Sequence, residues 1–363
     1  MRVLMLSTDA NILDIGSPVY NRMHEYARAV QELHIVVLCG KKTGVQFHDG
    51  NLHIYPTNSE KKLQRFFDAY DIAAGIIETR DLTEADSLIT CQDPFEVGFI
   101  GARLKKRFGL KLQLQIHTDF ASTFFLNESI KNRIRAMIAW HILPKADGIR
   151  VVSDRILAAL LLKKNSRIDE KKCAVLPIFV DVEKIKKTEA LDLSKKFPGF
   201  TYYIAMVSRL TEEKQVLWAA NIIGEIRKMY PGICLVIVGD GPLRAELEKI
   251  DYVRVTGWLK EPIGHIKGAQ LFLNTSLYEG YGRSLVEAAA AGARIITTDV
   301  GVARSVVTEG VNGFIVPVGD SEELEKRIID VIEHPSKLVG AEVIAQSKED
   351  FLAEHAAVWQ KCF

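Results

Sequence analysis

The sequence predicts an α/β protein with two doubly wound parallel sheets, each in its own domain. The length of 363 residues is too great for one ordinary core and suits two domains. The content of 48% hydrophobic and 26% charged residues is that of a globular protein. Short apolar runs alternate with helical stretches along both halves, and this alternation is typical of parallel sheets covered by helices on both faces.

Each half holds enough candidate strands for its own sheet. In the first half they lie at 3–7, 35–39, 52–55, 88–91, 111–116, 148–152 and 173–176. In the second half they lie at 203–207, 234–238, 253–256, 271–275, 294–297 and 313–316.

The best domain boundary is the charged segment of residues 181–200, which lacks strong periodicity and ends in Phe197-Pro198-Gly199. We therefore expect one domain over residues 1–190 and a second over residues 200–340. The segment 341–363 has helix-like spacing of apolar residues. We expect it to form a helix that closes the second domain or crosses back to the first.

Several classes of protein are disfavoured by composition. The longest apolar runs have strand length and fall short of the roughly 20 residues that span a bilayer. The N-terminal apolar run reaches Asp9 too early for a signal-peptide core. The five cysteines are scattered and show no zinc-site spacing, so we expect packing roles, no metal, and a cytoplasmic location.

The strongest local pattern lies between Leu271 and Gly292. A strand runs into a loop with two glycines, and an alanine-rich helix then begins near Arg283. Glycines permit close backbone approach, and a helix N-terminus offers free N–H groups to an anion. Glu279 on the loop and Glu287 in the helix are placed to face one crevice at the strand ends, where open α/β sheets bind ligands.

Two carboxylates beside an anion site make chemical sense if each accepts hydrogen bonds from a sugar diol. The alternative explanation for Glu287 alone is that the helix dipole favours acidic residues near the N-terminus. Upstream, Arg209 and Lys214 follow another strand and would hold the charge of a diphosphate leaving group. Without the glutamates they would be an ordinary exposed basic pair.

Two further strand ends carry glycine. The first is Gly239-Asp240-Gly241-Pro242, which is also good chemistry for a plain turn. The second is Gly257-Trp258, where the glycine allows the backbone to approach a flat base.

Together these elements resemble the donor-binding domain of glycosyltransferase family 4, retaining enzymes with the GT-B fold of two Rossmann-like domains facing a central cleft. Glu279 and Glu287 match the family's Glu-x7-Glu pattern, and Arg209 and Lys214 match its basic pair. The resemblance is dense over residues 200–320. It extends through the elements at 239–242, 253–257, 299–301 and 310–313.

The resemblance implies a role for each matched residue. Arg209 and Lys214 would hold the diphosphate, together with the backbone N–H groups of Arg283 and Ser284 that follow Gly282. Glu287 would bind the ribose hydroxyls, and Glu279 would contact the transferred sugar near the reacting centre. The family usually carries two aliphatic residues at positions 283 and 284, so the guanidinium of Arg283 is a departure from its pattern.

The first half resembles the family less densely. Gly16 lies in a loop after the first strand, where the family often has two adjacent glycines that approach donor and acceptor. An ordinary strand–helix turn is the alternative. His117 ends another strand and resembles the family's histidine near the donor sugar, where it would bind sugar hydroxyls. Asp119 is a weaker candidate.

The expected function is transfer of a hexose-type sugar, with retention, from a UDP- or GDP-sugar to a hydroxyl acceptor. The acceptor class would be a glycan, including a lipid-linked one, in cell-surface polysaccharide assembly. The expected catalytic residues are Glu279, His117, Arg209 and Lys214, with no metal or cofactor. A nucleotide-sugar epimerase of the same fold and a nucleotide-binding protein with a relict site remain open.

The uneven distribution of charge suggests which part of the chain would meet the acceptor. Residues 1–199 hold 30 Lys and Arg against 24 Asp and Glu, a balance of +6, whereas residues 200–363 hold 17 against 22. In the stretch 131–140, basic residues interleave with Ile134, Ile138 and Trp140. Such a helix is a candidate for peripheral contact with anionic lipid at the inner face of the membrane, with a solvated helix face as the alternative. Stacking platforms for nucleic acid are missing from the pattern.

Overall fold

The computed structural model describes residues 1–41, 46–164, 166–340, 343 and 345–363. These residues form two compact units, and each is described here by itself. Unit 1 comprises residues 1–177 and 348–363, and unit 2 comprises residues 178–347. No helix among the described residues is long and apolar enough to cross a membrane.

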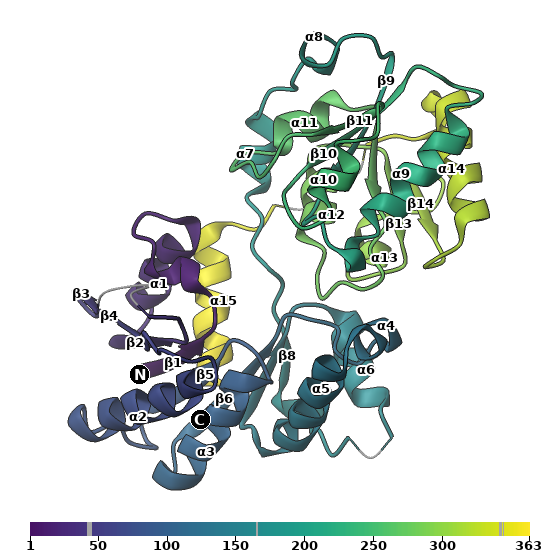
Figure 1. Cartoon of the computed structure of the whole chain (residues 1–363). Coiled ribbons are helices and arrows are strands. Elements are labelled where there is room, and N and C mark those ends of the chain that lie inside the picture. Colours follow the sequence, from purple (N-terminus) through teal and green to yellow (C-terminus); the bar gives the residue numbers. More distant parts are fainter. Residues whose placement is uncertain (42–45, 165, 341–342, 344) are drawn as a thin grey trace. The chain divides into compact units, whose positions relative to one another are not determined.

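Unit 1 is built on an eight-stranded sheet (Figure 1). Its strands, in spatial order, are β3 (Phe47–Asp49), β4 (Leu52–Pro56), β2 (Glu32–Val37), β1 (Arg2–Ser7), β5 (Ser87–Cys91), β6 (Lys111–Ile116), β7 (Gly148–Val151) and β8 (Cys173–Val175). All neighbours pair in parallel except β3, which is antiparallel to β4. The strand order reverses between β1 and β5, so this is where the crevice of a doubly wound sheet opens.

The helices of unit 1 connect its strands and cover the sheet. They are α1 (Pro18–Arg28), α2 (Gln64–Thr79), α3 (Glu96–Phe108), α4 (Thr123–Glu128), α5 (Ile130–Ile142), α6 (Asp154–Leu162) and α15 (Lys348–Gln360). The last of these lies far from the others in sequence but contacts α1 and β7 (Figure 1). Its buried face consists of Phe351, His355 and Trp359, one residue per turn, and the ring of His355 stacks on Tyr26.

Unit 2 contains a six-stranded, fully parallel sheet. Its strands, in spatial order, are β11 (Val253–Val255), β10 (Ile233–Val238), β9 (Tyr202–Val207), β12 (Leu271–Asn274), β13 (Ile295–Thr298) and β14 (Gly313–Val316). Its helices are α7 (Val182–Lys187), α8 (Leu193–Lys196), α9 (Val216–Ile226), α10 (Arg244–Leu247), α11 (Ile263–Gly268), α12 (Arg283–Ala290), α13 (Ala303–Val306) and α14 (Ser321–Glu333).

The two faces of this sheet have separate cores because successive side chains of a strand point to opposite faces. Ile204 and Met206 of β9 pack with the apolar sides of α9 and α14, whereas Ala205 packs with α12. Both faces are therefore covered, which explains why β10 reads as an unbroken apolar run.

All thirteen predicted strands overlap strands of the structure, whereas β3 was not predicted. The chain passes from unit 1 to unit 2 at residue 178, earlier than the segment 181–200 predicted as a boundary. The reason is that Val182 and Ile185 of α7 are buried against α12, and Leu193 of α8 is buried against Tyr203. These short helices therefore pack as part of unit 2.

Candidate functional site

Four of the predicted site residues lie at the switch point of the unit 2 sheet, where β9 and β12 are neighbours and the strand order reverses. Arg209 and Lys214 follow β9, and Glu279 and Glu287 follow β12. The carboxyl ends of parallel strands meet at one edge of a sheet. The fold therefore brings together two pairs of residues that are about 70 positions apart in the chain.

Lys214 and Glu279 form an ion pair, with 2.5 Å between Nζ and Oε1. Their side chains are only 12% and 16% exposed, and the hydroxyl of Ser276 donates to the same Glu279 oxygen at 2.9 Å. The Coulomb attraction of a pair held this far from solvent is stronger than at the surface, and loss of either partner would leave a poorly solvated charge. The ammonium has three donors, so it can keep this contact and still reach an anion.

The backbone holds this ion pair in register. The Thr275 hydroxyl donates to the carbonyl of Lys214 at 2.9 Å, and the N–H of Leu277 donates to the carbonyl of Glu213 at 2.8 Å. The loop after β12 is thereby fastened to the 3-10 turn Glu212–Lys214 that follows β9. The site residues are thus fixed by hydrogen bonds within unit 2.

Arg209 has a partner that the sequence analysis did not identify. Its Nη2 donates to Glu213 at 2.9 Å, and the Glu213 side chain is 10% exposed whereas that of Arg209 is 74% exposed. Glu213 therefore holds one edge of the guanidinium and leaves the rest of it available to a ligand. Arg209 lies outside any helix, so its pairing with Glu213 depends on the course of the loop after β9 and had no signal in the sequence.

The N-terminus of α12 begins at Gly282, whose φ of +86° is a conformation that glycine adopts without strain. No side chain caps this terminus, and the first N–H groups of a helix have no acceptor within it. Those of Arg283 and Ser284 are thus placed for an anion, next to the ion pair of Lys214.

Arg283, the departure from the family pattern, donates from Nε to Glu287 at 2.8 Å. Glu287 is largely buried at 12% side-chain exposure, and this desolvation raises its carboxyl pKa while Arg283 lowers it. One oxygen of Glu287 is thus occupied by the guanidinium. On balance the pKa of Glu287 is raised, because burial outweighs Arg283. Arg283 thus opposes the effect of burial in part and adds a cation at the helix terminus.

Gly239 and Gly241, which follow β10, are needed for close backbone packing. A Cβ on Gly239 would lie 1.8 Å from the carbonyl oxygen of Ser208, and one on Gly241 would lie 2.6 Å from that of Leu210. These glycines let the β10 turn pack against the segment that carries Arg209. The N–H of Gly239 donates to the carbonyl of Gly257 at 2.9 Å, and beside it Trp258 is 71% exposed.

In unit 1, Gly16 lies after β1 at the switch point of that sheet, with a φ of +87°. A Cβ there would meet nothing within 4 Å, and Ser17 caps α1 through the N–H of Tyr20. His117 follows β6, and its Nε2 lies 3.2 Å from Oε1 of Gln115. The residue as a whole is exposed at the strand end. Desolvation and then the charges of Arg150 and Arg22 lower the pKa of its ring to about 3, so the ring is neutral at pH 7.

Two carboxyl groups lie at neighbouring strand ends of unit 1. Desolvation raises the pKa of Asp119. Asp93, which was not predicted, follows β5 and accepts from the N–H of Phe95 at 2.7 Å; its burial raises the pKa to about 6. Among the described residues no group of His, Cys, Asp and Glu side chains has the arrangement of a metal site.

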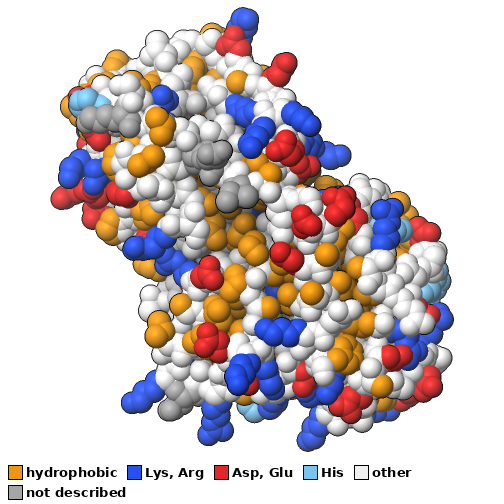
Figure 2. Space-filling model, turned by 180° about the vertical axis from the view of Figure 1, so that it is seen from behind, with side chains coloured by type: hydrophobic (Ala, Val, Ile, Leu, Met, Phe, Trp, Pro, Cys, Tyr) orange, Lys and Arg blue, Asp and Glu red, His pale blue; other side chains and the backbone are white. Residues whose placement is uncertain are grey.

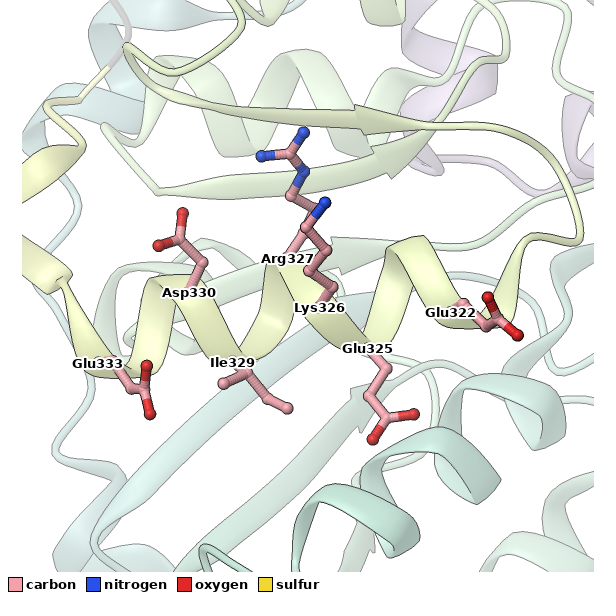
Figure 3. A pocket seen from close by; sticks show the side chains of 7 residues that line it. All are labelled: Glu322, Glu325, Lys326, Arg327, Ile329, Asp330 and Glu333. Carbon is pink, nitrogen blue, oxygen red and sulfur yellow. The ribbon is translucent and has the colours of Figure 1, made fainter.

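A hollow beside α14 has a different character (Figure 3). Its lining comes from that helix alone, with four acidic side chains, two basic ones and Ile329. Arg327 in it pairs with Glu323 at 2.6 Å. A net negative surface of this kind is unsuited to a diphosphate.

The basic stretch 131–140 lies in α5, and two of its three predicted apolar residues are not exposed. Trp140 and Ile138 are partly buried, and the Trp140 ring packs at 5.1 Å from that of Phe120. Ile134, the third apolar residue singled out in the sequence, is exposed, as are Ile130 and Met137 of the same helix. On the face shown in Figure 2, basic and acidic side chains are interspersed over the surface.

Comparison with known proteins connects this geometry with sugar transfer. Residues 201–334 match the family model described as glycosyl transferases group 1. This region contains all four residues of the switch-point site and the α12 terminus.

Two curated relatives match over parts of the chain of similar length. The poly(glycerol-phosphate) alpha-glucosyltransferase of Bacillus subtilis is 30% identical over 38% of this chain and 22% of its own length. The alpha-monoglucosyldiacylglycerol synthase of Acholeplasma laidlawii is 32% identical over 37% of this chain and 35% of its own length. The chain thus spans about a third or less of the length of these relatives.

Among solved structures, the Anabaena protein HepE in complex with UDP matches 100% of this chain and 96% of its own, with a TM-score of 0.67 and 17% identity. The same protein has been solved in complex with UDP-glucose. This likeness, together with the two parallel-sheet units, confirms the predicted GT-B fold. The family model and the relatives support a glycosyltransferase with that fold.

Proposed function

We propose that this chain is a retaining glycosyltransferase that moves a hexose-type sugar from a UDP- or GDP-sugar to a hydroxyl group. The observation that carries the proposal is the ion pair of Lys214 and Glu279 at the switch point of unit 2. Beside this pair lie the exposed guanidinium of Arg209 and the uncapped N-terminus of α12. This arrangement provides cations and N–H groups for a diphosphate, next to carboxylates for hydroxyl groups.

The chemistry follows from charge development. When the glycosidic bond to the diphosphate breaks, negative charge grows on the leaving group, and prearranged cations and N–H donors lower the barrier by stabilising it. Arg209, Lys214 and the first turn of α12 would fill this role without a metal. Glu287 would accept hydrogen bonds from the ribose diol, and Glu279 would contact the transferred sugar.

Retention requires the acceptor hydroxyl to reach the anomeric carbon from the face that the diphosphate leaves. The motif resemblance supports this outcome, and the Bacillus subtilis relative is named as an alpha-glucosyltransferase. His117 would bind sugar hydroxyls as a neutral ring, because its lowered pKa keeps a positive charge away from the site.

The acceptor class is proposed to be a glycan or lipid-linked glycan of the cell surface, met in the cytoplasm at the inner face of the membrane. Ile130, Ile134 and Met137 lie on one face of α5, since residues three and four apart are neighbours on a helix. Lys131 and Arg133 are also exposed on this helix. Apolar and basic groups together suit the surface of anionic lipid.

The function is tested by a donor screen. The protein is incubated with UDP- and GDP-hexoses and a panel of glycan and lipid-linked acceptors, and released nucleotide is measured. We expect release that depends on both donor and acceptor, and a product whose anomeric configuration by NMR equals that of the donor. Inversion at the anomeric carbon would contradict retention, and an epimerised sugar from donor alone would indicate an epimerase.

Membrane contact is tested separately with liposomes. Wild-type protein should sediment with anionic vesicles more than with neutral ones, and the substitution Met137→Glu should reduce this binding. Met229→Glu is the matched control, because Met229 is a comparably exposed methionine of unit 2. Equal sedimentation of both variants with anionic vesicles would contradict a role for α5.

A further inference from the structure

A row of buried polar side chains crosses the unit 1 sheet and ends at His117. Because alternate residues of a strand share a face, Gln113, Gln115 and His117 follow one another along one face of β6 and beyond its end. The parallel register pairs Thr90 of β5 with Gln113, and Gln115 with Arg150 of β7. All four of these strand residues are buried.

Arg150 determines which end of the Gln115 amide faces His117. Its Nη1 lies 3.0 Å from Oε1 of Gln115. A guanidinium can only donate, so the amide atom that faces it must be the oxygen. The other guanidinium nitrogen donates to the carbonyls of Leu176 and Pro177, each at 3.2 Å, which fixes Arg150 in place.

The contacts of Gln115 with β5 give the same orientation of its amide independently. Nε2 of Gln113 donates to the carbonyl of Val358 in α15, so Gln113 presents its oxygen to the hydroxyl of Thr90, at 3.0 Å. Thr90 must then donate to that oxygen, and its lone pair accepts from Nε2 of Gln115 at 2.9 Å. The contacts on both sides of Gln115 therefore turn its oxygen toward His117.

The tautomer of His117 follows from this orientation. Oε1 of Gln115 lies 3.2 Å from Nε2 of the imidazole and can only accept, so Nε2 must carry the proton. In the neutral ring, Nδ1 then carries no proton and presents a lone pair. A lone pair accepts a hydrogen bond from a hydroxyl group but cannot donate one to a phosphate oxygen.

We propose that Gln115 and Arg150 are positioning residues that hold His117 as the Nε2–H tautomer, so that Nδ1 accepts a hydrogen bond from a hydroxyl group of the sugar substrate. This inference rests on the proposed function only for the identity of the ligand. The tautomer itself is a property of the free protein. Neither Gln115 nor Arg150 was singled out by its sequence pattern.

The charges around the ring are consistent with this role. Arg150 and Arg22 both disfavour protonation of His117, and no carboxylate is among the groups that shift its pKa. The Nη1 of Arg150 that donates to Gln115 also lies 3.3 Å from Nε2 of His355 in α15. His355 must accept there, and its own pKa is held far below the usual value by burial and by Arg150.

The first experiment observes the tautomer directly in the full-length protein. Long-range ¹H–¹⁵N NMR of protein with ¹⁵N-labelled histidine distinguishes a protonated ring nitrogen from an unprotonated one, and His117→Gln identifies the resonance. We expect Nε2–H in the wild type and a mixture of tautomers in Gln115→Leu. An Nδ1–H ring in the wild type, or an unchanged tautomer in Gln115→Leu, would overturn the proposal whether or not sugar transfer is found.

The second experiment measures turnover with the donor and acceptor found in the screen. Gln115→Leu should lower kcat by roughly 10- to 100-fold through misorientation of the ring. UDP affinity should stay unchanged, because the nucleotide contacts belong to unit 2. Gln115→Glu keeps an acceptor oxygen and should recover part of kcat, with the acidic limb of the pH profile moved to higher pH by the added carboxylate.

The control is Gln46→Leu. Gln46 also hydrogen-bonds to a histidine, His48, at 2.8 Å, but both residues are at the edge of the unit 1 sheet near β3. This variant should retain wild-type kcat. Equal turnover by Gln115→Leu and wild type, despite an altered tautomer, would exclude the role in catalysis and leave the donor site of unit 2 unaffected.

Discussion

On the function proposed above, the two units would meet the needs of a sugar nucleotide with different chemistry. In unit 2, Lys214, Glu279, Arg283 and Glu287 are all in ion pairs, and Arg209 pairs with a buried glutamate. In unit 1, His117 is neutral and is held by an amide, and the guanidinium behind it is bound by uncharged groups. A diphosphate requires cations, whereas the sugar hydroxyl assigned to His117 requires an acceptor with a fixed lone pair. Substitutions in each unit should therefore have effects of different kinds and sizes.

The largest effect is expected for Lys214→Met. Loss of the ammonium removes charge stabilisation of the leaving group, so kcat should fall about 100- to 1000-fold. It also leaves the poorly exposed Glu279 without its cation, so the melting temperature should fall. Adding Glu279→Gln should restore the melting temperature but not kcat. Recovery of both in the double variant would show that Lys214 acts only on stability.

A smaller effect is expected for Glu287→Ala, which removes the proposed acceptor for the ribose hydroxyls. Hydrogen bonds to a charged group contribute about 1.5–3 kcal/mol, so UDP affinity by calorimetry should fall roughly 10- to 100-fold. The matched control is Glu325→Gln on α14, which should bind UDP like the wild type. If Glu287→Ala binds UDP normally, the ribose assignment is wrong.

Asp93 provides a test within unit 1, because it is a partly buried residue whose carboxyl pKa is raised to about 6. A folded-state pKa above the unfolded value of 3.8 means that the folded state loses stability as pH rises from about 4 to above 6. Asp93→Asn should therefore be more stable than wild type at pH 7, by up to about 3 kcal/mol, but not at pH 4. Urea unfolding at both pH values measures this, and an equal difference at each would contradict the raised pKa.

The smallest effect is expected for Arg283→Leu. Arg283 lowers the pKa of Glu287 against the desolvation that raises it, so its removal should raise that pKa further. UDP affinity should then decline at a higher pH than in the wild type as acid is added. The difference from wild type should be less than about tenfold on the acidic limb and should vanish at alkaline pH, where the carboxyl is charged in both proteins. An affinity that changes equally over the whole pH range would instead indicate direct contact of Arg283 with the ligand.

The strands and the unit 2 site could be predicted because their signals are contiguous in sequence. Buried parallel strands are apolar runs, and the site residues directly follow β9 and β12. By contrast, β3 is the short polar segment Phe47–Asp49, and only its pairing with β4 makes it a strand. The pairing of Arg283 with Glu287 is an i, i+4 contact on α12 that spacing along the helix would have revealed. The pairing of Arg209 with Glu213 depends instead on the course of the loop after β9.

The network behind His117 could not be predicted in the same way. Gln115 and Arg150 are 35 residues apart, and they meet only because of the register between β6 and β7. Likewise, His355 reaches Arg150 because the last helix packs on unit 1, and the boundary at residue 178 depends on where Val182 and Ile185 are buried. These are consequences of three-dimensional packing rather than of local pattern.

The most direct test of the central claim is hydrogen–deuterium exchange of the full chain with and without UDP. The account predicts that UDP protects amides in residues 208–215 and 279–287, the segments that follow β9 and β12, with no protection of α14. Protection confined to α14, or elsewhere with those two segments unchanged at saturating UDP, would contradict the donor site at the switch point of unit 2.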